Sequence, residues 1–386
     1  MYFFNPWHDL ALSNFAASYT PPASAVKMAD DMALLPVWYG NGEAVIAEGE
    51  ANRSFLDALK SVLPLTAEMI SSQEIVLRRE ERIIPWGWSP MLRRKMASLG
   101  AGEHQLPSME ELERLKEYTN RKNAVRLLRE LKKEEKSFCG ESYYFIRLEE
   151  LLEFLQSAPG DKILKMPVSG SGKGLIWILG NITDKQTDWC RRVIREQGGV
   201  VAEPVLRKVQ DFAMEFYVQE GKTQFAGYSL FHSAASGAYA GNELLSDSKI
   251  VERLSGYIRT DLLHGLRESL KQKLSLFFPF YTGYAGVDMM ACETEEGYRI
   301  QPCVEINLRM NMGVVARIFH ERYMECGAEG KFKVNYFKNQ GDAQSFHKKM
   351  QRESPLKVAY GKILSGYQPL TPVTSDTRYM AYVQIC

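Results

Sequence analysis

The first hundred residues alternate short apolar runs with polar stretches, at two different spacings. Continuous apolar runs predict strands, and apolar residues at every third or fourth position predict helices. In chain order these segments are residues 44–48, 54–63, 82–86 and 90–100. In the first helix Leu56, Leu59 and Val62 lie on one face, and Gly100 is well placed to end the second. Strands that alternate with helices predict a small parallel α/β unit.

A highly charged stretch, residues 108–136, follows this unit. Ser108 and Glu111 have the spacing of a capping box, so a helix is expected to begin at Ser108. The helical pattern breaks near residues 119–120, and a second helix is expected from Arg121. The charges are typical of a solvated helix face, and the change in composition predicts a domain boundary in this region.

The middle of the chain is rich in predicted strands. They are residues 162–167, 174–179, 200–206, 212–218, 224–231, 284–292 and 298–307. Two predicted helices, 148–156 and 261–276, interrupt this series. After residue 330 a polar, helix-like stretch leads to a strand-like tail at 380–385. The chain is thus predicted to mix helices and strands in an α/β (α+β) fold.

Length, composition and charge limit the classes of protein that this chain can belong to. A length of 386 residues is more than one core of common size holds, which predicts two or three subdomains. Hydrophobic residues make up 45% of the chain and charged residues 25%, as in globular proteins. A net charge of +1 gives no general attraction to nucleic acids or acidic membranes, so neither is an expected partner.

Targeting and cysteine patterns point to the cytoplasm. No stretch is apolar over the roughly 18 residues of a membrane-spanning helix. The N-terminal segment lacks the basic and apolar regions of a signal peptide. The six cysteines are scattered and suggest neither a zinc site nor a disulfide framework. We therefore expect a soluble, cytoplasmic protein.

A glycine-rich loop is the sharpest local signal in the sequence. It follows Lys165 and consists of Ser169, Gly170, Ser171, Gly172, Lys173 and Gly174. Closely spaced glycines let backbone amides close on phosphate oxygens, while serines and a lysine add donors and positive charge. The loop differs from a P-loop and from a dinucleotide-binding loop in spacing, and a strand follows it where those loops open a helix. The alternative is a plain flexible hairpin between two antiparallel strands.

A second signal combines two carboxylates, an amide and a guanidinium. Glu305, Asn307 and Arg309 alternate along a predicted strand, which puts them on one face. Asp288 would lie on the neighbouring antiparallel strand if residues 293–297 form the turn. Such all-oxygen ligands suit Mg²⁺, which completes its shell with water and phosphate oxygens. The alternative is a charged, exposed sheet face, although the intervening residues are apolar and expected to be buried.

A third, weaker signal lies between these two. Glu203 and the backbone of Val205 lie where a strand leaves through a proline, and they are candidates to face the edge of an adenine. Asp211 follows shortly after. Taken alone, a surface acidic pair is the simpler interpretation.

In this order, the motifs resemble those of the ATP-grasp superfamily over about residues 115–315. The resemblance implies two α+β subdomains that grip ATP, preceded by an N-terminal α/β pre-ATP-grasp domain. The implied ranges are 1–115 for that domain, 116–205 for the subdomain with the glycine-rich loop, 206–330 for the subdomain with the metal site, and 331–386 for a C-terminal extension. Two departures are Gly286, where ligases that join two D-alanines carry an arginine, and a wide Asp288–Glu305 spacing.

The resemblance also implies a role for each residue of the motifs. Phosphate contacts are implied for Arg121 (with Lys122 as the alternative), Lys165, Ser169, Gly170, Ser171, Gly172 and Lys173. Glu203 and Val205 would address the adenine, and Asp211 would lie near the ribose. Asp288, Glu305 and Asn307 would hold Mg²⁺, or Mn²⁺ in its place. Arg309 and Lys173 would be catalytic, steadying the transferred phosphoryl group.

The implied activity is ATP-dependent ligation of a carboxylate to an amine through an acyl-phosphate. The partners would be ATP, a small-molecule or peptide carboxylate and an amine acceptor. Two alternatives share the nucleotide motifs: a kinase that phosphorylates a hydroxyl, and a nucleotide-binding sensor without turnover. The sequence leaves the oligomeric state open, with a homodimer as the commonest arrangement of soluble oligomers.

Overall fold

The computed structural model describes residues 1–170, 174–234, 237 and 239–386. The chain divides into two compact units. Unit 1 comprises Met1–Glu113, Ala240–Lys249 and Met310–Cys386, and unit 2 comprises Arg114–Tyr239 and Ile250–Arg309. Both contain helices and strands, which confirms the predicted mixed α/β class. The four domain ranges implied by the resemblance remain a prediction.

The N-terminal part of unit 1 is the small parallel α/β unit expected from the sequence. Its elements are β1 (Tyr2–Phe3), α1 (His8–Asn14), α2 (Ala23–Asp31), η1 (Leu35–Trp38), β2 (Val45–Ile46), α3 (Glu50–Lys60), β3 (Met69–Ile70), η2 (Ser72–Leu77), β4 (Ile84–Pro85), α4 (Pro90–Ser98) and η3 (Glu103–Gln105). The strands pair in parallel in the order β3-β2-β1-β4. Gly100 follows α4 with a φ of +88°, as predicted for a residue that ends a helix. Val62 was expected to share one helix face with Leu56 and Leu59, but it lies beyond the helix end and is exposed, because α3 stops at Lys60.

The remaining parts of unit 1 add a second sheet. They are β11 (Tyr239–Leu244), α11 (Met312–Tyr323), β14 (Gly330–Tyr336), α12 (Asp342–Glu353), β15 (Lys357–Ala359), β16 (Lys362–Pro369) and β17 (Tyr379–Ile385). These strands follow the order β11-β14-β17-β16-β15. The stretch after residue 330 was predicted to be helical, which is wrong for its first part. That part is β14, paired along its length with β17, and only α12 is helical there.

Two of the four places where the chain passes from one unit to the other lie inside helices. These helices are α5 (Met109–Thr119) and α9 (Asp247–Leu254). The predicted capping box is confirmed at the start of α5, where the Ser108 N–H donates to Glu111 Oε2 at 2.7 Å and the Glu111 N–H donates to Ser108 Oγ at 3.2 Å. The predicted break near residues 119–120 is also confirmed, because the next helix begins at Lys122.

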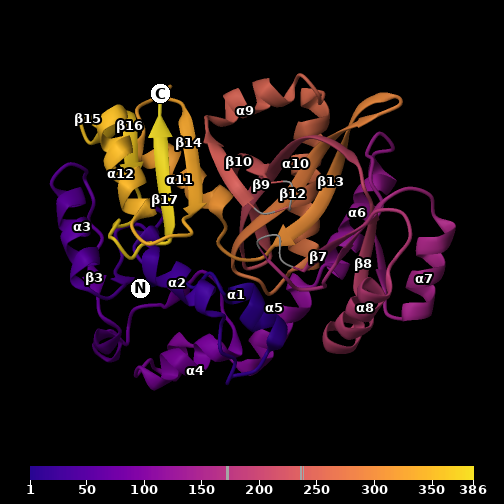
Figure 1. The fold of residues 1–386 in the computed structure, drawn as a ribbon, viewed down its shortest axis with the longest axis horizontal. Helices are drawn as coiled ribbons and strands as arrows, with labels where there is room; N and C mark the ends of the chain where they lie inside the picture. Colours follow the sequence, from indigo (N-terminus) through magenta and orange to yellow (C-terminus); the bar gives the residue numbers. More distant parts are fainter. Residues whose placement is uncertain (171–173, 235–236, 238) are drawn as a thin grey trace. The chain divides into compact units, whose positions relative to one another are not determined.

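Unit 2 carries the predicted strands of the middle of the chain. Its elements are α6 (Lys122–Glu134), β5 (Tyr143–Phe145), α7 (Leu148–Ser157), β6 (Lys162–Lys165), β7 (Leu175–Ile178), α8 (Asp184–Gln197), β8 (Val200–Pro204), β9 (Arg207–Gln219), β10 (Lys222–Ser233), α10 (Thr260–Phe277), β12 (Gly283–Thr294) and β13 (Gly297–Asn307). They form a sheet in the order β5-β8-β6-β7 and four antiparallel strands in the order β13-β12-β9-β10 (Figure 1).

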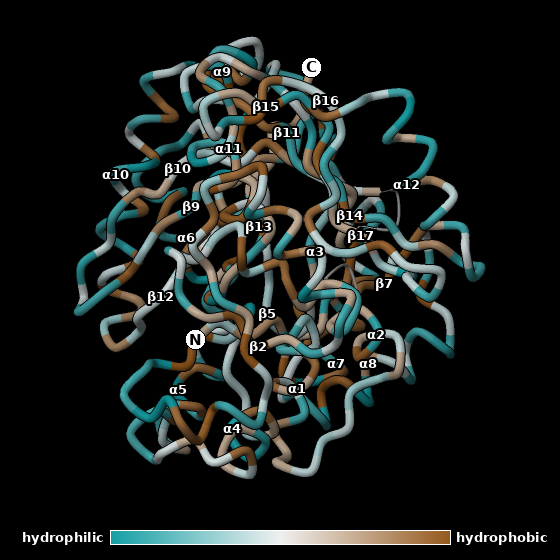
Figure 2. Tube along the Cα trace, turned by 90° about the vertical axis from the view of Figure 1, so that its left-hand side faces the viewer, coloured by the Kyte–Doolittle hydropathy of each residue, from teal (hydrophilic) through white to brown (hydrophobic). Residues whose placement is uncertain are grey.

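Each sheet of unit 2 buries one face against helices. Leu164 and Ala202 of the smaller sheet join a core with Leu151 of α7 and Cys190 of α8. One face of the four long strands is covered by α6 and α10, and α10 contributes buried leucines at helical spacing. Figure 2 shows hydrophobic and hydrophilic residues alternating along α10, as expected for a helix with one buried side.

Candidate active site

Four polar side chains gather on one face of the strands β9, β12 and β13. The antiparallel register sets Asp288 opposite Glu305, as predicted from the sequence. It also sets Gly286 opposite both Asn307 of β13 and Glu215 of β9. Directly opposite residues of antiparallel strands point to the same side, and so do residues two positions apart. Asp288, Glu305, Asn307 and Glu215 therefore share one face.

The alternation of residues along β9 explains why this face is polar. Phe212, Met214 and Phe216 are completely buried, and they alternate with the residues of the polar face. A shift of one residue would move these three aromatic and aliphatic side chains out of the core, so the register is strongly fixed. The same alternation buries Val287 of β12 opposite Ile306 of β13. Burial of the apolar face thus holds the carboxylates together on the other.

The carboxylates repel each other. Asn307 Nδ2 donates a hydrogen bond of 3.0 Å to Asp288 Oδ2. Burial, together with the negative charges of Glu305 and Glu215, raises the pKa of Asp288 well above its ordinary value, and the positive charge of Arg309 only partly opposes this. Arg309 was predicted to continue the strand face, but β13 ends at Asn307, so Arg309 lies two residues past the strand end. Its charge nevertheless acts on the same carboxyl group.

The donor set suits a hard divalent cation. Asp288, Glu305 and Asn307 offer only oxygen ligands, and a cation among them would relieve the repulsion that raises the pKa of Asp288. In the described ranges, no three His, Cys, Asp or Glu side chains are grouped so that they hold a metal ion by themselves. Mg²⁺ is commonly bound by one or two carboxylates, with substrate phosphates and water completing its shell. The residues present fit such a shared site.

Arg121 connects this face to the glycine-rich loop. It lies at the start of α6 and is only 6% exposed. Its guanidinium donates to the Met166 carbonyl at 2.7 Å, to Ser169 Oγ at 2.8 Å and to Glu305 Oε1 at 2.5 Å. Lys122 forms an ion pair with a glutamate of α5 instead, and both groups are exposed. The geometry therefore favours Arg121 over Lys122 as the residue that faces the loop.

A buried ion pair lies on the smaller sheet. Lys165 Nζ is 2.7 Å from Glu203 Oε2, and both residues are 5% exposed. Ser142 Oγ donates to Glu203 Oε1 at 2.9 Å, so each oxygen of the carboxylate has a partner. The sheet register places Ile163 opposite Glu203, and Lys165 is therefore on the same face, away from the core of α7 and α8. A charged pair at this depth needs such complete pairing to be tolerated.

The glycine-rich loop connects two antiparallel strands, β6 and β7, so a strand follows it as expected. Lys165 pairs with Leu175 across the two strands, and the Met166 N–H donates to the Gly174 carbonyl at 2.8 Å. Gly174 has a φ of +77°, and a Cβ there would lie 2.8 Å from the Cβ of Ser169. Only glycine is compatible with both features. Ser169 and Gly170 are buried, whereas the predicted Ser171, Gly172 and Lys173 lie outside the described residues.

The two remaining predicted residues lie near the start of β9. The Val205 N–H donates to the Asp161 carbonyl at 3.0 Å, so this donor is already used within the chain. Any contact of Val205 with a base would involve its carbonyl group or its exposed side chain. Asp211 shares a face of β9 with Glu215, and its carboxylate is 2.6 Å from Lys208 Nζ and 2.8 Å from Ser233 Oγ.

Cys303 is close to both groups of charged residues, the ion pair of the smaller sheet and the carboxylates of the larger one. It lies on β13 two residues before Glu305, and it is buried. Burial, with the nearby carboxylate of Glu203 as the next cause, raises the pKa of this thiol well above its ordinary value, and Lys165 and Asp288 also act on it. The ion pair on the smaller sheet and the carboxylates of the larger one are thus within electrostatic reach of one thiol.

Similarity to known proteins is found in structure and not in sequence. The amino-acid sequence matches no family model and no curated sequence. A solved structure of N5-carboxyaminoimidazole synthetase from Staphylococcus aureus, complexed with ADP, is similar over 90% of this chain and 93% of its own, at 11% identity and a TM-score of 0.49. A biotin carboxylase complex from Campylobacter jejuni is similar over 89% and 87%, at 13% identity and a TM-score of 0.49. An L-amino acid ligase from Bacillus licheniformis is similar over 89% and 93%, at 11% identity and a TM-score of 0.44.

These similarities are weak in both identity and TM-score. In the described part of the chain, no helix has the length and apolar character needed to cross a membrane.

Proposed function

We propose that this chain binds Mg-ATP on the polar face of unit 2 and uses it to activate a carboxylate for attack by an amine. The observation that carries the proposal is that Arg121 joins the glycine-rich loop to the carboxylates of the sheet. This one side chain contacts the glycine-rich loop at Ser169 and the carboxylate Glu305, which stands opposite Asp288. A loop suited to phosphate and a face suited to Mg²⁺ are thus within reach of one guanidinium.

The nucleotide would use the residues on both sides of this contact. Arg121, Lys165 and the loop residues Ser169, Gly170, Ser171, Gly172 and Lys173 would contact the phosphates. Glu203 and Val205 would face the adenine, with Asp211 near the ribose. Asp288, Glu305 and Asn307 would hold Mg²⁺, which neutralises phosphate charge when bound. These roles agree with the resemblance to the ATP-grasp superfamily.

Two buried cations are paired with carboxylates. Arg121 is bonded to Glu305, and Lys165 to Glu203. A phosphate group can replace a carboxylate as partner of either cation, because both are oxygen anions of similar charge. Arg121 would exchange Glu305 for a phosphate oxygen, which leaves Glu305 available as a metal ligand. The site would therefore bind the nucleotide and the metal together.

The chemical step requires charge neutralisation and positioning. The carboxylate substrate attacks the γ-phosphorus, ADP leaves, and an amine then displaces phosphate from the acyl-phosphate. Arg309 and Lys173 would stabilise the charge that develops on the transferred group. Loss of one such preorganised contact costs about 3 kcal/mol of transition-state stabilisation, or roughly a hundredfold in rate. We expect this loss for Arg309→Ala, and at least as large a loss for Glu305→Gln.

The test is release of ADP and of inorganic phosphate from Mg-ATP, assayed separately over pools of carboxylic acids and amines. Equal, pool-dependent release of both products is expected, with loss in Glu305→Gln. A matched control is Glu295→Gln, an exposed residue in the turn between β12 and β13, which should keep full activity. ADP without phosphate would identify a kinase instead. Tight Mg-ATP binding without turnover in any pool would favour the sensor, and unchanged turnover in Glu305→Gln would refute the site.

A further inference from the structure

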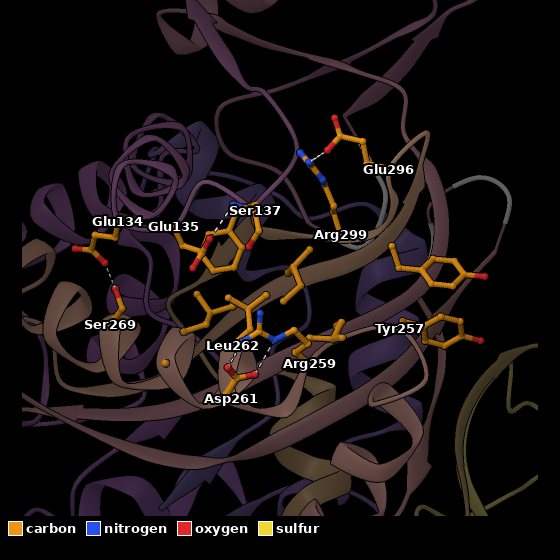
Figure 3. A pocket seen from close by; sticks show the side chains of 16 residues that line it. Glu134, Glu135, Ser137, Tyr257, Arg259, Asp261, Leu262, Ser269, Glu296 and Arg299 are labelled. Atoms are coloured by element: carbon orange, nitrogen blue, oxygen red, sulfur yellow. Dashed lines mark hydrogen bonds and ion pairs between the residues drawn. The ribbon is translucent and has the colours of Figure 1, made fainter.

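Unit 2 contains a pocket of about 560 Å³ that the nucleotide proposal does not use. It is formed by the end of α6 and the following turn, the start of α10, and the first residues of β13 (Figure 3). The polar face lies at the other ends of two of these elements, because α6 starts next to Arg121 and β13 ends at Asn307. The pocket is therefore separate from the candidate active site.

The wall that α10 contributes has a clear pattern. Leu262, Gly265, Leu266 and Ser269 line the pocket, at the spacing of one helix stripe. A Cβ built on Gly265 has no atom within 4 Å, and its φ is not positive. Glycine is a poor helix former, so its use in an 18-residue helix calls for a reason. Neither crowding nor backbone conformation requires it here, and its effect is to keep this wall open.

Apolar and aromatic side chains make up the rest of the interior. Phe138, Ile258 and Ile300 are buried residues that form its floor. Tyr257 and Tyr298 both line the pocket and meet edge to face, with ring centroids 5.0 Å apart. Such a lining accepts the apolar body of a ligand, and tyrosine faces also attract cations.

The charges around the rim pair almost completely. Two ion pairs join lining residues, Arg259–Asp261 and Arg299–Glu296, and Glu134 pairs with Lys273, which is outside the lining. Glu135 is the exception, because its carboxylate accepts the Ser137 N–H at 2.8 Å and forms no ion pair within the described ranges, while the charge of Arg259 acts on it from beyond ion-pair distance. The lining carries four carboxylates and two guanidinium groups, so one negative charge is left when Lys273 is counted as the partner of Glu134. The C-terminal end of α6, at Glu134, adds the partial negative charge of its carbonyl groups.

We propose that this pocket binds a monocationic amine with an apolar body. Its ammonium group would lie against Glu135 and the end of α6, and its body against the stripe of α10 and the two tyrosines. The charge balance selects a cation over an anion, and the open position at Gly265 leaves room for the body. This site does not depend on the proposed use of ATP, so either proposal can fail without the other.

The experiment measures binding of 4-phenylbutylamine and of 4-phenyl-1-butanol, which share one apolar body, by isothermal titration calorimetry on the whole chain. Wild type is expected to bind the amine at least tenfold more tightly than the alcohol. Glu135→Gln should remove most of this preference, whereas Glu153→Gln on the exposed side of α7 should keep it. Gly265→Met places a side chain in the pocket and should abolish binding of both compounds.

Gly265→Ala is the matched control for the helix. It adds a single methyl group into open space and improves helix propensity, so it should keep the amine and not lower the melting temperature. The melting temperature of Gly265→Met should also be no lower than that of wild type. Absence of binding, equal affinity for the amine and the alcohol, or amine binding that survives Gly265→Met would each overturn the proposal.

Discussion

Asp288→Asn is expected to stabilise the protein while destroying its activity. Burial and two neighbouring carboxylates disfavour the charged form of Asp288. An asparagine has nearly the same shape, and its carbonyl oxygen can still accept the hydrogen bond from Asn307 Nδ2. The substitution therefore removes the repulsion without leaving the amide of Asn307 unpaired.

The size of the effect follows from the strand geometry. Side chains directly opposite on antiparallel strands have Cβ atoms about 5 Å apart. Two unit charges at about 5 Å interact with roughly 3 kcal/mol at an effective dielectric constant near 20. The positive charge of Arg309 offsets part of this repulsion. We therefore expect a gain of about 1–2 kcal/mol, and each 1 kcal/mol raises the melting temperature of a unit of this size by roughly 2–4 °C.

The pH dependence of the melting temperature distinguishes the removal of charge repulsion from a general packing effect. The pKa of Asp288 is higher in the folded protein than in the unfolded chain. Folding is therefore penalised as pH rises above the unfolded pKa, and the penalty is complete above the folded pKa. Wild type and Asp288→Asn should melt at similar temperatures near pH 4, and the gap should widen toward pH 8.

The assay is thermal melting at several pH values, with and without Mg²⁺ and an ATP analogue. The ligands should raise the melting temperature of wild type more than that of Asp288→Asn, and the variant should lack ATP turnover. Glu295→Gln serves as the control for loss of one carboxylate from the same hairpin. A variant less stable than wild type at pH 8, or a gap that does not change with pH, would refute this account of the electrostatics.

Two further predictions concern the smaller sheet and its loop. Lys165→Met leaves Glu203 buried without its cation and should lower the free energy of unfolding by about 3–5 kcal/mol in urea titrations. The double variant Lys165→Met with Glu203→Leu should recover most of this loss. Equal losses in the single and double variants would contradict this expectation. Gly174→Ala should lower the melting temperature of the protein more than Gly180→Ala. Both glycines have φ near +80°, but only at Gly174 would a Cβ meet another side chain, 2.8 Å away. Equal melting temperatures for these two variants would show that the contact with Ser169 does not matter.

Much of the site could be predicted because it follows from strand alternation. The pairing of Asp288 with Glu305 required only two alternating strands and a short turn between them. The hairpin at the glycine-rich loop followed from the apolar strand that comes directly after Gly174. Such patterns are local, so the sequence contains them in full. The roles of these residues in binding ATP remain predictions.

Residues that act through tertiary contacts were missed or misplaced. Glu215 had a signal, since it is one charged residue inside an apolar run, but its closeness to Asp288 depends on the order of the strands. Ser142 and Cys303 carry no pattern that points to Glu203. Arg309 was assigned to a strand that ends two residues earlier, and alternation alone does not show where pairing stops.

The error after residue 330 has a different cause. Phe332 alternates with lysines in β14, and alternation of this kind is typical of a strand with one solvated face. Because the segment is mostly polar, this alternation does not stand out in the sequence. Its pairing with β17 along the whole strand then decides the conformation, because tertiary pairing overrides weak local preference.

Titration of the protein with a non-hydrolysable ATP analogue, with and without Mg²⁺, tests the central claim most directly. We predict that binding of the analogue depends on Mg²⁺. In the presence of Mg²⁺, Glu305→Gln should weaken this binding at least tenfold, and Glu295→Gln should leave it unchanged. Absence of binding, or binding equally strong without Mg²⁺ and in Glu305→Gln, would contradict the claim that these carboxylates form a metal–nucleotide site.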